Sequence, residues 1–149
     1  MFKRLVSKSA IPIAKKFARG DRVYVGALQA WQILTAFVMF GRQGSSLGAK
    51  TMSYGDLARA MGYEDARAGH TLSRQLGIVA RFCIANDLPP LNAIVVVEAT
   101  GAPGEEVLLR EGQTSWRKEQ KAVAAHDWFA IRPPTTGTLR KIWEAQQQT

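Results

Sequence analysis

The stretch TMSYGDLARAMGY at residues 51–63 gives the clearest structural signal in the sequence, because it contains the start, the body and the end of one short helix. Ser53 is a typical N-cap residue, and Asp56 follows at the third helical position, where a carboxylate suits both a capping box and the helix dipole. The inward face is expected to consist of Leu57, Ala60 and Met61. Gly62 tolerates the left-handed backbone that commonly ends a helix, so a short helix is predicted just before it.

A longer apolar pattern follows. Five residues recur at the three- and four-residue spacing of a buried helix face: Leu72, Leu76, Val79, Ala80 and Cys83. Three arginines share a different face, because Arg67, Arg74 and Arg81 are seven residues apart. The prolines at 89 and 90 end the pattern. The sequence therefore predicts a second helix over residues 64–87 that carries a cationic stripe.

The flanking sequence predicts the remaining elements. Residues 93–97, AIVVV, form a β-branched strand that ends in a glycine- and proline-containing turn, and residues 107–109 predict a returning strand. Upstream, residues 23–41 predict a long apolar helix, and residues 2–19 a basic amphipathic helix interrupted at Pro12. Downstream, residues 113–125 and 138–147 predict two further helices.

Composition and charge narrow the partners. The chain has 149 residues, 46% of them hydrophobic and 21% charged, which suits a globular domain that is long enough to bury a core. Lysine and arginine outnumber aspartate and glutamate by 20 to 12, giving a net charge of +8. Such an excess attracts nucleic acids, anionic membranes and acidic proteins, although surface charge that only keeps the protein soluble is the alternative.

Few residues are available for cofactor or metal chemistry. Cys83 is the only cysteine, which excludes an internal disulfide and a cysteine-rich zinc site. The only histidines are His70 and His126, so a metal site would consist mostly of carboxylates. The sequence contains no phosphate-binding glycine loop and no catalytic serine motif. No cofactor is therefore expected, and the lone thiol suits a reducing, cytoplasmic location.

Residues 23–41 carry no charge and superficially resemble a membrane anchor. However, Gln29, Gln32 and Thr35 recur along one side of the predicted helix, and two glutamines near a bilayer centre would be unfavourable. We interpret this stretch as a buried helix with one wetter side, and no membrane insertion is expected.

Two helices joined by a glycine-containing turn and followed by a β-hairpin are the parts of a winged helix-turn-helix. In such a unit the first helix braces the second, the second faces a nucleic-acid groove, and the wing reaches phosphates. The predicted fold is α+β, with a winged helix-like domain and a small antiparallel hairpin over residues 51–149. A basic N-terminal helical extension over residues 1–50 belongs to the same compact unit. The predicted function is non-catalytic binding of nucleic acid, with DNA preferred to RNA.

Three short motifs carry a resemblance to a known family. Ser53-Tyr54-Gly55-Asp56-Leu57-Ala58 resembles the start of the DNA-binding module of alkylguanine-DNA alkyltransferases and alkyltransferase-like proteins. Ala66-Arg67-Ala68-Gly69 resembles the start of that family's recognition helix, and Leu88-Pro89-Pro90-Leu91 follows at the corresponding place. Over about residues 51–104, the resemblance implies that Tyr54 helps to rotate a nucleotide out of the duplex. It also implies that Arg67 takes the place of that nucleotide in the stack.

The sequence departs from this family where the chemistry would occur. The family's Pro-Cys-His-Arg motif is replaced by Asn92-Ala-Ile-Val-Val-Val97, which lacks the thiolate, the histidine and the arginine. Cys83 cannot substitute for them, because it belongs to the predicted buried face and is expected to be inert. Alkyl transfer is therefore excluded. The stretch between Gly69 and Leu88 is also longer than the family's recognition region.

The candidate nucleic-acid contacts and their alternatives follow from these patterns. The candidates are Tyr54, Arg67, His70, Arg74 and Arg81. Alternatively, the tyrosine packs the first helix onto the core, the arginines form a solvated stripe, and the histidine is a surface residue. The four tryptophans are expected to anchor the core rather than to stack on bases: Trp31, Trp116, Trp128 and Trp143.

Two other functions stay open. One is a protein-interaction factor from a phage or mobile element that occupies the nucleic-acid site of another protein. The other is a metal-dependent enzyme acting on nucleic acid, with ligands drawn from Glu98, Glu105, Glu106 and Asp127. A polar hairpin turn also explains the glutamates. The oligomeric state and the target sequence are not determined by these patterns.

Overall fold

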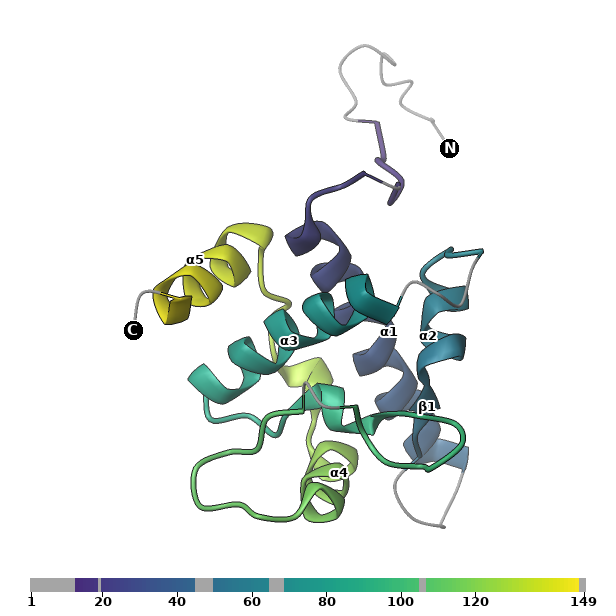
Figure 1. Ribbon diagram of the computed structural model, residues 1–149, viewed down its shortest axis with the longest axis vertical. Helices are drawn as coiled ribbons and strands as arrows, with labels where there is room; N and C mark the ends of the chain where they lie inside the picture. The colour runs from purple at the N-terminus through teal and green to yellow at the C-terminus, as the bar shows by residue number, and fades with distance from the viewer. Residues whose placement is uncertain (1–12, 19, 45–49, 65–68, 105–106, 148–149) are drawn as a thin grey trace, which may run out of the picture.

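The computed structural model describes residues 13–18, 20–44, 50–64, 69–104 and 107–147. The fold is α+β, as predicted, and its elements follow in this order: α1 (Val23–Gly44), β1 (Met52–Ser53), α2 (Tyr54–Ala60), α3 (Gly69–Ala85), the 3-10 helix η3 (Leu91–Ile94), β2 (Val95–Val96), α4 (Trp116–Ala125), the 3-10 helix η4 (Trp128–Ala130) and α5 (Thr136–Gln147). Helices α1 and α3 pack at the centre, α5 packs against both, and α4 lies at the other end of the molecule (Figure 1).

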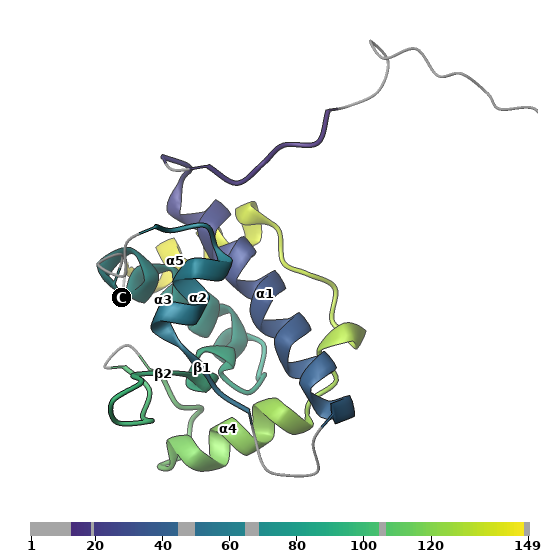
Figure 2. The same ribbon diagram turned by 90° about the vertical axis from the view of Figure 1, so that its right-hand side faces the viewer.

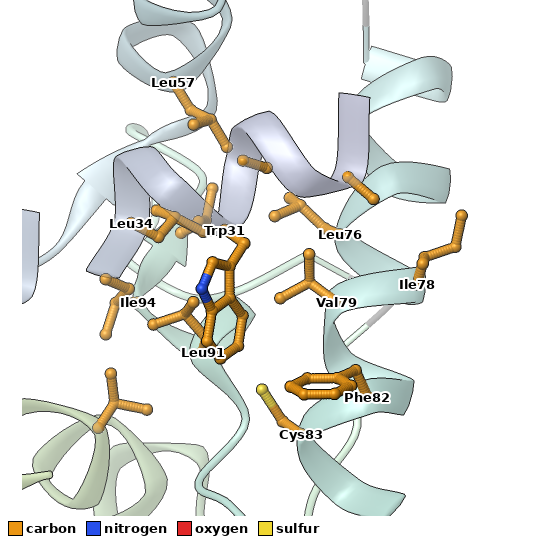
Figure 3. Close-up of a cluster of buried hydrophobic side chains, with 14 of the residues drawn as sticks. Trp31, Leu34, Leu57, Leu76, Ile78, Val79, Phe82, Cys83, Leu91 and Ile94 are labelled. Carbon is orange, nitrogen blue, oxygen red and sulfur yellow. The ribbon is translucent and has the colours of Figure 1, made fainter. Parts of the chain in front are cut away.

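The core lies between α1 and α3. Trp31 of α1 is 2% exposed and makes edge-to-face contacts with Phe82 of α3 and Trp128 of η4, with ring centroids 5.3 and 5.5 Å apart. Figure 3 shows the indole of Trp31 reaching toward Phe82 and Cys83, with Leu91 and Ile94 beside it. The buried face predicted for the second helix is confirmed, because its five residues are at most 1% exposed: Leu72, Leu76, Val79, Ala80 and Cys83.

Local hydrogen bonds define both ends of α2, as the sequence predicts. The hydroxyl of Ser53 accepts from the backbone N of Asp56 at 3.1 Å. At the other end Gly62 has φ +91°, and the backbone N of Tyr63 donates to the carbonyl of Ala58 at 2.9 Å, which closes a Schellman-type cap. One detail of the prediction is wrong. Ala58, not Ala60, lies on the buried face with Leu57 and Met61, because the short helix turns that side toward α1.

The predicted antiparallel hairpin is wrong. Strand β2 pairs instead with β1, in parallel, with Met52 opposite Val95 and Ser53 opposite Val96 (Figure 2). The chain does turn back after β2, but a single antiparallel bridge, Val96 to Pro103, replaces the predicted strand at residues 107–109. Proline has no N–H to extend a ladder of hydrogen bonds, so the pairing stops there.

The N-terminal segment also differs from the prediction. Residues 13–18 are exposed and contain no helix, so the predicted helix over residues 2–19 is wrong there, while residues 2–12 and 19 lie outside the described part. A short amphipathic helix gains most of its stability from burying its apolar face. Here Ile13 is 88% exposed and Phe17 43% exposed, so no such burial occurs. The segment leads away from the body at the amino end of α1 (Figures 1 and 2).

Helix α1 is the one described helix whose length and apolar composition, over Val23–Gly41, would allow a membrane span. Core helices of soluble proteins meet the same criterion. In this fold Ala27, Ala30 and Leu34 are fully buried on its inner side, and Gln32 is exposed. The side chain of Gln29 donates to the carbonyl of Met61 at 3.2 Å, so this glutamine links α1 to the end of α2.

Candidate functional site

Tyr54 holds a loop in place at the start of α2. Its side chain is half-buried against the core, and its hydroxyl accepts from the backbone N of Gly104 at 3.0 Å. The loop between β2 and Gly104 is closed by three backbone hydrogen bonds at Val97. Its N donates to the carbonyl of Ala102 (2.8 Å), and its carbonyl accepts from Thr100 N (3.1 Å) and Gly101 N (2.7 Å). The tyrosine therefore positions the loop in which the wing was predicted.

The cationic stripe predicted on α3 does not form one open surface. The guanidinium of Arg81 is half-buried and donates to the side chain of Gln146 on α5. One turn before it, Gly77 faces the ring of Trp143, which a β-carbon built at that glycine would contact at 3.7 Å. Helix α5 thus covers the carboxyl-terminal half of the stripe. The seven-residue spacing of the arginines could not predict this cover.

Arg74 is the predicted contact that stays open. Its side chain is exposed and has no hydrogen bond or ion pair with another described residue. Arg67 lies outside the described residues. His70 is in the first turn of α3, but its side chain also lies outside the described part. Of the predicted contacts on α3 whose side chains are described, Arg74 is therefore exposed and Arg81 is covered by α5.

A cleft of about 500 Å³ adjoins Arg74. It lies where the start of α1, the end of α2 and the first half of α3 meet the segment that precedes α1. Its lining comprises Phe17, Ala18, Gly20, Asp21, Val23, Gly26, Gln29, Met61, Gly62, Tyr63, Arg74 and Gln75. Its volume lies within the range of small-ligand sites in proteins.

Gln75 is a buried polar residue in the lining of this cleft. Only 3% of the residue is exposed, its Nε2 donates to the hydroxyl of Tyr63 at 3.2 Å, and its Oε1 has no hydrogen-bond partner among the described residues. The amide lies directly over Gly26, where an added β-carbon would come within 2.0 Å of Nε2. A glycine inside α1 is therefore needed for a buried glutamine on α3, a pairing that helical periodicity in either segment does not indicate.

Positive charge gathers around the amino end of α1. Arg22 and Arg140 border a second, smaller hollow of about 160 Å³ with Thr136 at the start of α5. Lys15 and Lys16 precede Phe17 of the cleft. Five side chains define what we call the arm surface: Lys15, Lys16, Arg22, Arg74 and Arg140. All are exposed, and none has an ion pair within the described part of the chain. Asp21, whose carboxylate accepts from the backbone N of Ala18 at 2.7 Å, is the acidic residue that lines the cleft.

The described residues contain no group of three or more histidine, cysteine or acidic side chains that could hold a metal ion. Glu105 and Glu106 lie outside the described residues. Glu98 is exposed, and the carboxylate of Asp127 accepts from the backbone N of Phe129 at 3.2 Å, which caps η4. The carboxylates proposed as metal ligands are therefore not gathered in the part of the chain that can be assessed.

Cys83 is a core residue. It is completely buried, and burial raises the pKa of its thiol from 9.0 to about 12. The native protein should therefore resist alkylation by iodoacetamide below about pH 9 and react only when it unfolds. Because the folded-state pKa is the higher one, stability should fall as the pH rises from 9.0 toward 12. Mass spectrometry of alkylated native and urea-unfolded protein tests this, and rapid labelling of the native state would contradict it.

No family model, curated protein or solved structure matches this chain.

Proposed function

We propose that this protein binds nucleic acid without catalysis, with DNA preferred to RNA, through the arm surface. Helices α2 and α3 act as a helix-turn-helix in this proposal, and the loop of residues 97–104 takes the place of the wing. The observation that carries the proposal is the arm surface itself. Five exposed cations lie on the segment before α1, on α3 and on α5, and none forms an ion pair with an acidic residue in the described part of the chain.

This proposed mode of binding differs from one in which the whole length of α3 lies in a nucleic-acid groove. Arg74 is exposed in the first half of α3, whereas α5 covers Gly77 and Arg81. Arg74 projects from α3 beside the cleft, and Lys15 and Lys16 directly precede Phe17, which lines the same cleft. A basic arm beside the start of a recognition helix can contact the phosphates that flank the groove in which the helix lies. Phosphate contacts of this kind position a protein without reading sequence.

Salt dependence tests this proposal. The triple variant Arg22→Gln, Arg74→Gln and Arg140→Gln removes three cations from the arm surface. If all three contact phosphates, the slope of log affinity against log salt should become shallower by about 2 to 3, because each neutralised phosphate contributes about 0.9. Affinity for duplex DNA at low salt should fall by about 10- to 100-fold, as measured by fluorescence anisotropy at two salt concentrations.

Helix α4 provides a matched control. The variant Arg117→Gln, Lys118→Gln and Lys121→Gln removes the same charge from exposed residues at the opposite end of the molecule (Figure 1). We expect it to retain the wild-type slope. Equal losses in the two variants would show that net charge, not the arm surface, governs binding. Absence of salt-dependent binding to duplex and to single-stranded DNA alike at about 50 mM salt would reject the proposed function altogether.

One surface favours a second candidate, a protein-interaction factor. Phe40 and Phe129 are 66% and 59% exposed, and their rings pair edge-to-face with centroids 5.8 Å apart. They lie at the end of α1 and in η4, and Phe129 also borders a hollow with Trp31 and Trp128. Exposed aromatic residues of this kind are common at protein interfaces. If the titrations with DNA show no binding, this aromatic surface is where we expect a protein partner to bind.

A further inference from the structure

The amide of Gln75 has one hydrogen-bonding group that no residue in the described part of the chain uses. Oε1 is unpartnered while Nε2 donates to Tyr63. Turning the amide over would let the tyrosine hydroxyl donate to Oε1 and would leave Nε2 unused instead. In either orientation one polar atom lies buried beside a cleft of about 500 Å³ without a partner.

This arrangement lowers the free energy of unfolding. An apolar residue at position 75 could supply the same packing without that loss. An unsatisfied buried polar group costs free energy, and a glycine inside a helix is less favourable than alanine. Gly26 and Gln75 combine both penalties at one place, because the glycine makes room for the amide. Local conflicts of this kind concentrate at functional sites.

The rest of the cleft specifies the chemistry of a ligand. A carboxamide matches the donor and acceptor edge of a nucleobase, and glutamine is one of the side chains that proteins use for that purpose. The hydroxyl of Tyr63 supplies a second polar contact, and the ring of Phe17, 43% exposed, is an aromatic face at the rim. Aromatic faces stack on unpaired bases regardless of sequence. Arg74 lines the same cleft and offers a cation for a phosphate.

We propose that this cleft binds an unpaired base of the nucleic acid held by the arm surface. Gln75 and Tyr63 contact the edge of the base, Phe17 stacks on its face, and Arg74 pairs with an adjacent phosphate. This inference rests on the proposed function and specifies its preferred substrate, a single-stranded segment rather than an intact duplex. No bond is made or broken, so the cleft is a binding site and not a catalytic one.

The test compares strands that differ only in their bases. One fluorescent single-stranded oligonucleotide carries all its bases, and a second of equal length and charge carries abasic sites. Wild-type protein should bind the first on the order of tenfold more tightly. In Gln75→Leu this preference should shrink severalfold, because leucine keeps the volume but cannot contact the base edge. The slope of log affinity against log salt should stay as in the wild type, because no cation is removed.

A second variant and a control keep the test decisive. Tyr63→Phe removes the hydroxyl that bonds Gln75 and should also reduce the preference for the strand that carries bases. It tests the site independently if Gln75→Leu fails to fold. Gln32→Leu changes an exposed glutamine of α1 outside the cleft and should leave the preference intact. Equal wild-type affinity for both strands, with a normal salt slope, would overturn the base site and leave the proposed function standing. If the wild-type protein shows no salt-dependent binding to either strand, the proposed function itself is overturned.

Discussion

Replacing Trp31 with alanine is expected to lower the free energy of unfolding by about 3–5 kcal/mol. The indole is 2% exposed and contacts Phe82 and Trp128 edge-to-face, so one side chain joins α1, α3 and η4. Its removal leaves a cavity that three elements would have to close together. Because small domains are stable by only about 5–15 kcal/mol, the loss is a large part of the total. Urea denaturation followed by circular dichroism measures it.

Phe40→Ala is the matched control for Trp31→Ala. Phe40 lies on the same helix but is 66% exposed, and its described ring contact is with the exposed Phe129. We expect it to change the free energy of unfolding by less than about 1 kcal/mol. Similar losses in the two variants would show that the contacts of Trp31 do not carry the stability of the core.

Glu119→Ala is expected to destabilise the protein by about 3 kcal/mol. The glutamate lies in α4 and is 1% exposed, yet it accepts from the backbone N of Arg110 at 3.2 Å and from its guanidinium at 2.7 Å. The side-chain hydrogen bond with Glu119 raises the pKa of Arg110. Loss of the carboxylate would leave the partly buried guanidinium without its charge partner and would release the segment before α4. Denaturation midpoints measure the global effect, and amide hydrogen exchange at Arg110 measures the local one.

The exposed pair of Asp56 and Arg59 provides the comparison for Glu119. Its side chains are 60% and 69% exposed, so solvent screens their attraction. Asp56→Ala should therefore cost no more than about 1 kcal/mol. If Glu119→Ala costs as little, or if exchange at Arg110 does not accelerate, the buried ion pair does not anchor the segment.

The proposed function depends on how α5 divides the cationic stripe of α3. Without α5, the stripe predicted from Arg67, Arg74 and Arg81 would suggest a continuous reading face. In the fold, Arg81 bonds to Gln146, Arg74 lines the cleft beside the start of α1, and Arg22 and Arg140 border a separate hollow there. The interface expected here is therefore centred on the amino end of α1, and its ligand is expected to include an unpaired segment.

The features that depend on residues close together in the chain could be predicted from local patterns. Ser53 and Gly62 mark the ends of α2, because each cap is a hydrogen-bonded arrangement within a few residues. The spacing of apolar residues placed the inner face of α3, and the expected core positions of Trp31 and Trp128 are confirmed. Trp116 and Trp143 are only half-buried, because α4 and α5 lie on the outside of the central pair.

The features that join distant residues became visible only in the folded structure. Helical periodicity did not indicate that Arg81 meets Gln146, that Gln75 lies over Gly26, or that β2 pairs in parallel with β1. Each of these contacts joins residues that are more than 40 positions apart. Which face of an element a neighbour covers depends on how all the elements pack together, and a local pattern carries no record of that packing.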